Sequence, residues 1–175
     1  MPKEIINPNS ITRDDLPLIV LSGHSWNIIS FLIRLRTKAT YNHIMMMRYP
    51  REFVSQDYVY RQVPMDKYLK RGNRLKFWKI KDLTFEEKAI LHKKVNDDLA
   101  AHWWYRKYDV IGVVFGQLLG IKKINNPLTN YCSERVADTL RTIIPEIPHH
   151  PSPTELNNFF KKHSRFEVYG YWFVE

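Results

Sequence analysis

Short apolar and alternating segments along the chain predict a set of β-strands. Strands are expected at residues 18–21, 41–48, 52–56, 58–63, 74–80 and 165–174. Pro50, Pro64 and the Gly72-Asn73 pair are turn signals that separate the middle segments. Residues 41–80 are therefore predicted to form an antiparallel meander, with the aromatic-rich segment near the C-terminus as a further strand.

A second pattern, with apolar residues every three or four positions, predicts helices between these strands. Thr84 and Glu87 have the spacing of a capping box and open a helix. Its apolar face consists of Leu91, Val95, Leu99 and Trp103. Further helices are expected to begin near Ser25, near Asp109, at Thr129 or Asn130, and at Ser152. The combination predicts an α+β fold, an antiparallel sheet packed against helices.

Length and composition indicate one domain spanning residues 1–175. The chain has 44% hydrophobic residues and shows no internal repeat or long linker, so one core is expected to form from the whole sequence. A single cysteine excludes an internal disulfide and a cysteine-rich zinc site. The formal net charge of +9 favours anionic partners, such as nucleic acid, acidic lipid or cell-envelope polymers.

The first residues lack the pattern of a secretory signal peptide, and the longest apolar run, at residues 110–121, is too short to cross a bilayer. These features predict a location in the cytoplasm or, for a phage protein, in the host cytoplasm or the virion. The oligomeric state is left open by the sequence.

Candidate chemistry centres on Cys132, which falls in the first turn of a predicted helix. Backbone N–H groups and the helix dipole favour the thiolate at such a position, although a lone cysteine is also an ordinary small core residue. A thiolate nucleophile needs an imidazole as base. His43, on a predicted strand that rigidly positions its side chain, is the best candidate among seven histidines, with His24 as the main competitor.

Two short motifs carry a resemblance to a known family. Tyr131-Cys132-Ser133-Glu134 opens a predicted helix, and Tyr41-Asn42-His43-Ile44 opens a strand that follows a basic helix. Further matching segments lie at residues 53–56, 63–69 and 108–109. This order resembles the circularly permuted papain-like cysteine hydrolases of the NlpC type, common in bacteria and their phages, in which the histidine strand precedes the cysteine helix.

The resemblance implies that Cys132 is the nucleophile and His43 the base of an acyl-transfer reaction, an amidase or peptidase activity that needs no cofactor and no metal. The third, orienting residue of the family falls at Gln56, where a glutamate is more usual, and Glu52 is the fallback. The resemblance also implies a peptide, cell-wall or acyl-ester substrate.

Several other functions stay open beside this hypothesis. The chain is alternatively a non-catalytic relative or a lipid-directed acyltransferase. Residues 70–81 mix cations with Phe77 and Trp78, as a nucleic-acid-binding module would, but strand alternation also explains the cations as a solvated face. Nucleic acid is therefore not the first choice of partner. A zinc hydrolase is disfavoured because no His-Glu-x-x-His spacing occurs.

Overall fold

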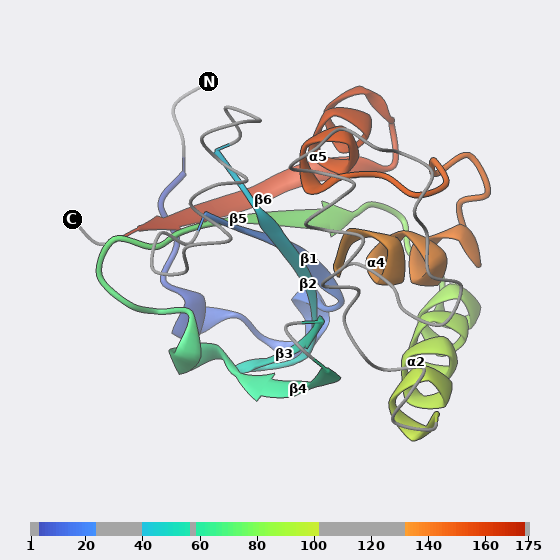
Figure 1. The fold of residues 1–175 in the computed structure, drawn as a ribbon, viewed down its shortest axis with the longest axis horizontal. Coiled ribbons are helices and arrows are strands. Elements are labelled where there is room, and N and C mark those ends of the chain that lie inside the picture. The colour runs from blue at the N-terminus through green and yellow to red at the C-terminus, as the bar shows by residue number, and fades with distance from the viewer. Residues whose placement is uncertain (1–3, 24–39, 57–58, 102–131, 174–175) are drawn as a thin grey trace.

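A computed structural model describes residues 4–23, 40–56, 59–101 and 132–173 of the protein (Figure 1). The strands are β1 (Leu18–Gly23), β2 (His43–Tyr49), β3 (Glu52–Gln56), β4 (Tyr60–Pro64), β5 (Arg74–Ile80) and β6 (Phe166–Phe173). The helices are α2 (Phe85–Ala100), α4 (Cys132–Arg141) and α5 (Pro153–Lys162), with short 3-10 turns η1 (Pro8–Ser10), η2 (Arg13–Asp15) and η3 (Met65–Lys67). The helices expected near Ser25 and Asp109, together with His24 and Trp103, lie outside the described residues.

The strands form one six-stranded sheet in the order β4-β3-β2-β1-β5-β6, and all neighbouring pairs are antiparallel. The α+β prediction is therefore confirmed. The expectation of one continuous meander over residues 41–80 is wrong, because β5 pairs with β1 and β6 instead of β4. The first strand of the chain thus separates the two parts of the expected meander.

Two apolar clusters cover the two faces of this sheet. The helices α2, α4 and α5 pack against one face through a cluster that includes Ile19, Met46 and Trp78 of the strands (Figure 1). Side chains from the opposite face, such as Val20 and Phe77, pack with residues of the segments 11–16 and 63–68. Because both faces are covered, the central strands are buried along almost their whole length.

Local sequence signals set the beginnings of two helices. Thr84 and Glu87 form the predicted capping box of α2: the Glu87 amide donates to Thr84 Oγ1, and Glu87 Oε2 accepts from the Thr84 amide. Ser152 and Glu155 form the same arrangement at α5, with Pro153 as the first helical residue. These reciprocal bonds satisfy backbone N–H groups that the helix itself leaves unpaired.

An N-terminal arm, residues 4–6, runs along the outer edge of β6. The Ile6 amide donates to the Tyr171 carbonyl and the Tyr171 amide donates to the Glu4 carbonyl, each at 2.8 Å. Gly170 permits this close approach, because a Cβ atom there would lie 2.4 Å from Cγ2 of Ile6. None of the helices that the structure describes is long and apolar enough to cross a membrane.

Candidate functional site

Cys132 opens the described part of α4, whereas Thr129 and Asn130, the expected caps of this helix, lie outside the described residues. Its side chain is buried, 3% exposed, in the cluster between the sheet and the helices, together with Val136 and Leu140 from the same helix face. At the start of a helix the thiol lies in the positive field of the backbone N–H groups, which favours its ionised form. Position and burial are therefore compatible with a held nucleophile and also with a core cysteine.

His43 is the first residue of β2, and hydroxyl groups hold its half-buried imidazole. Nε2 lies 2.8 Å from Oγ of Ser55 and 3.5 Å from the hydroxyl of Tyr68. Oγ of Ser55 in turn lies 2.9 Å from the Tyr68 hydroxyl. The rings of His43 and Tyr68 are stacked, with centroids 6.0 Å apart and planes inclined by 12°. The orientation of the imidazole is thus fixed by both hydrogen bonding and ring contact.

The first turn of α4 contacts the end of the sheet at which β2 begins and β3 ends. Arg135, in the first turn of α4, has its guanidinium carbon 5.4 Å from the centroid of the Tyr60 ring. Tyr60 pairs with Gln56 at the end of β3. Because β2 and β3 are antiparallel, the last residues of β3 lie beside the first residues of β2. His43 and Gln56 therefore lie at the same end of the strands, and the first turn of α4 reaches this end through Arg135.

Strand alternation places His43 and Gln56 on opposite faces of the sheet. His43 shares the face of Met45 and Met47, whereas Cys132 belongs to the apolar cluster on the helix side, which also contains Ile44 and Met46. The imidazole, at the start of β2, and the thiol thus lie on opposite faces of the sheet. Contact between the Cys132 sulfur and the His43 imidazole stays a prediction.

The hydrogen bond at Nε2 of His43 goes to Ser55, one residue before the expected orienting residue. Gln56 is buried and shares the face of Val54, two positions earlier, so it points to the helix side of the sheet. Glu52, the fallback, pairs with Tyr49 at the opposite end of β3 from Ser55. The expectation that Glu52 could orient the imidazole is therefore wrong. The hydroxyl groups were missed because their role depends on strand register, which the sequence does not contain.

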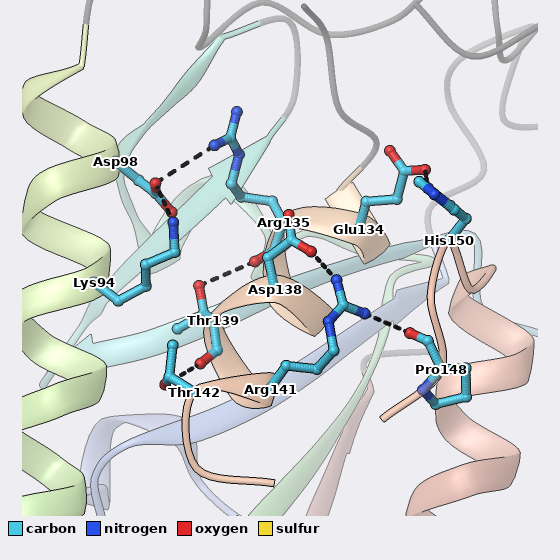
Figure 2. Close-up of polar contacts among 10 residues, drawn as sticks. All are labelled: Lys94, Asp98, Glu134, Arg135, Asp138, Thr139, Arg141, Thr142, Pro148 and His150. Carbon is cyan, nitrogen blue, oxygen red and sulfur yellow. Dashed lines mark hydrogen bonds and ion pairs between the residues drawn. The ribbon is translucent and has the colours of Figure 1, made fainter. Parts of the chain in front are cut away.

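A buried polar cluster surrounds the first turns of α4 (Figure 2). Oδ1 of Asp98 accepts from Nζ of Lys94 at 2.7 Å and lies 3.6 Å from Nη1 of Arg135. The pKa of the neighbouring Tyr60 is raised, chiefly by burial and further by the negative charge of Asp98. Tyr60 is therefore a neutral, protonated neighbour of this ion-paired cluster.

A second set of contacts fastens the proline-containing segment after α4 to that helix (Figure 2). Nδ1 of His150 lies 2.6 Å from Oε1 of the buried Glu134, and Nη1 of Arg141 donates to the Pro148 carbonyl at 2.6 Å. Arg141 also pairs with Asp138. Glu134 belongs to the Cys-Ser-Glu motif, and its carboxylate contacts this segment through His150.

The basic strand β5 does not present a solvated cationic face. Lys76 is 4% exposed, with Nζ 4.0 Å from the centroid of the Trp78 ring and 3.3 Å from Oδ1 of Asn157. The expectation that Lys76 is simply solvated is wrong, because α5 covers this side of the strand. Phe77 and Trp78 are also buried, so neither ring is positioned to stack on a nucleic-acid base.

No group of three histidine, cysteine, aspartate or glutamate residues within the described part of the chain is arranged to hold a metal ion. This finding concerns only residues 4–23, 40–56, 59–101 and 132–173.

Comparison with known proteins shows similarity in fold alone. No protein-family model matches the sequence, and no curated protein matches it. Among solved structures, the chain is similar to a metalloprotein of Escherichia coli O157:H7, yiiX, a DUF1105 protein. The sequence identity is 16% and the TM-score 0.52, over 90% of this chain and 97% of the other. The similarity supports the α+β architecture across nearly the whole chain.

Proposed function

We propose that the protein is a cysteine hydrolase of the amidase or peptidase type, with Cys132 as nucleophile and His43 as base. One observation carries the proposal: the first turn of α4, which holds Cys132, contacts Tyr60 through Arg135 at the end of the strands where β2 starts with an oriented His43. The papain-like order of the two motifs along the sequence agrees with this arrangement.

The proposed reaction has two acyl-transfer steps. His43 accepts the proton of the Cys132 thiol, and the sulfur bonds to the carbonyl carbon of an amide, ester or thioester. Backbone N–H groups at the start of α4 stabilise the negative oxygen that develops. The leaving group departs with the proton from His43. Water then adds to the acyl carbon, the C–S bond breaks, and the proton returns to the sulfur.

Because Nε2 of His43 is engaged with Ser55, the proton exchanged with Cys132 passes through Nδ1 in this proposal. Because strand alternation puts the imidazole on the face opposite to the Cys132 cluster, formation of the pair requires a local rearrangement at the start of β2.

The test is a screen of purified wild type and Cys132→Ala with fluorogenic amide, ester and thioester probes. Turnover by wild type that falls by about 10³-fold or more in Cys132→Ala, with trapping of an acyl group on Cys132 by mass spectrometry, supports the proposal. Turnover that Cys132→Ala leaves unchanged contradicts it.

A non-catalytic role is the principal competing function. It predicts no turnover on any probe class and no response of the His43 resonances when Cys132 is alkylated. A change in the His43 imidazole shifts on alkylation, measured by NMR, is expected if the two side chains meet.

A further inference from the structure

We propose that Ser55 and Tyr68 are the positioning residues of the candidate site: Tyr68 fixes the Ser55 hydroxyl, which fixes Nε2 of His43. This inference rests on the proposed function for its consequence in catalysis. The hydroxyl pair takes the orienting role that the sequence assigns to Gln56.

The first step of the argument is the geometry of the hydroxyl chain. The separations of 2.8 Å between His43 Nε2 and Ser55 Oγ, and of 2.9 Å between Ser55 Oγ and the Tyr68 hydroxyl, are both ordinary hydrogen-bond lengths. Ser55 is completely buried, so its hydroxyl acts on the imidazole and is not itself presented to a substrate. Its burial distinguishes a positioning role from that of a serine nucleophile.

The second step is that Tyr68 is itself held from several sides. Its ring makes an edge contact with Phe53, at a centroid distance of 5.6 Å. The Tyr68 amide donates to the Met65 carbonyl at 2.8 Å, and its carbonyl accepts from Nδ2 of Asn73 at 2.7 Å. A tyrosine fixed at its ring and its backbone can define the position of the Ser55 hydroxyl.

The third step concerns proton direction. A hydroxyl donates one hydrogen bond while it accepts others, so Nε2–H can donate to Ser55 while Ser55 donates to Tyr68. In that direction of the chain the proton of neutral His43 is on Nε2, and Nδ1 is the basic nitrogen. We assign this direction to the chain because it gives the tautomer that a base acting through Nδ1 needs.

The charged neighbour on this segment is Lys67, whose Nζ lies 5.4 Å from the centroid of the Tyr68 ring. Removing the Tyr68 hydroxyl leaves both this contact and the stacking on His43 possible, because phenylalanine keeps the ring. Tyr68→Phe is thus a selective variant, and Ser55→Ala removes the central hydroxyl. Tyr49→Phe, at the opposite end of β2 from His43, is the matched control.

The experiment combines NMR of His43 with the rate of Cys132 alkylation over a range of pH. In wild type, the nitrogen shifts are expected to show the Nε2–H tautomer. Ser55→Ala should weaken that preference and slow alkylation by up to about 10²-fold, because the base is misoriented. Tyr68→Phe should have a smaller effect in the same direction, which disappears in the Ser55→Ala background because the two hydroxyls act in series. Tyr49→Phe should leave both readouts unchanged.

The two readouts separate failure of this inference from failure of the proposed function. A His43 tautomer that ignores Ser55→Ala and Tyr68→Phe, in variants whose spectra show intact folds, overturns the positioning role. A tautomer that responds while Cys132 alkylation is indifferent to both variants and to His43→Ala leaves the hydroxyl chain standing and overturns the cysteine–histidine pair.

Discussion

Arg165 binds Glu87 through both terminal nitrogens: Nη1 donates to Oε1 at 2.7 Å and Nη2 donates to Oε2 at 2.8 Å. This parallel pair of charge-assisted hydrogen bonds joins the turn before β6 to the capping box of α2. The hydrogen bonds from Arg165 are the main cause that lowers the pKa of Glu87 below its ordinary value of 4.5.

Glu87→Gln is expected to lower the free energy of unfolding at neutral pH by about 1 kcal/mol, because the pair is partly exposed. A carboxyl with a lowered folded-state pKa contributes stability above its unfolded-state pKa, and this contribution is lost as the pH falls through the folded-state pKa. The difference between wild type and Glu87→Gln should therefore shrink below pH 4.5. Urea unfolding across this range checks it. The exposed neighbour Glu86→Gln is the control, and an equal loss there would contradict the assignment to Arg165.

Cys132 is the only cysteine in the chain, so alkylation reports on it alone. In the proposed pair, the helix start and protonated His43 both favour the thiolate, so the alkylation rate is expected to rise with a midpoint below the ordinary value of about 8.5. His43→Ala should move that midpoint upward. Iodoacetamide rates from pH 5 to 10 measure it, each normalised to its own plateau because the thiol is buried. A midpoint that ignores His43 would indicate that the imidazole does not reach the thiol.

Oδ1 of Asn157 lies 3.2 Å from Trp78 Nε1 and 3.3 Å from Lys76 Nζ, all within the buried contact between α5 and β5. Asn157→Ala removes an acceptor from two buried donors and should lower the free energy of unfolding by about 2 kcal/mol. Asn158→Ala, at the exposed neighbouring position, should change it by less than about 0.5 kcal/mol. Thermal and urea unfolding of the two variants give the comparison, and equal effects would contradict the role of this acceptor.

Gly170→Ala should displace the N-terminal arm, because the new methyl group would overlap the Ile6 side chain. The Ile6 and Tyr171 amides, which join the arm to β6, should then exchange with solvent at least about 10-fold faster, since less free energy is needed to open them. Combining Gly170→Ala with Ile6→Ala should restore part of the protection. Hydrogen exchange followed by NMR resolves these amides. Unchanged protection in the single variant would show that the arm adapts without loss of pairing.

The elements that the sequence predicts correctly are those with local signals. Thr84 with Glu87, and Ser152 with Glu155, cap the expected helices, since each bond joins residues three positions apart. The position of Cys132 near the start of a helix is also predicted from local signals, the spacing of apolar residues along residues 132–144. The insertion of β1 between β2 and β5 depends instead on pairing across distant parts of the chain, and no local pattern specifies that pairing.

The candidate site shows the same division. His43 at the start of a strand is predictable, whereas its bond to Ser55 depends on how β2 and β3 align. The burial of Lys76 could not be predicted for a related reason: alternation shows which residues share a face of the strand but not whether both faces are covered. Burial of that ammonium group requires knowledge of α5, which lies about eighty residues further along the chain, as the Lys76–Asn157 separation of 81 shows.

The arm along β6 has a consequence for the behaviour of the protein at high concentration. The outermost strand of a sheet exposes backbone N–H and C=O groups that can recruit a strand from another molecule, the first step of many aggregation reactions. At β6 the arm occupies such groups at Tyr171. At the other end of the sheet, β4 carries exposed Arg61 and ends at Pro64, which has no N–H to donate. Each edge thus has its own device against intermolecular strand addition, and loss of the arm should convert β6 into a self-association surface.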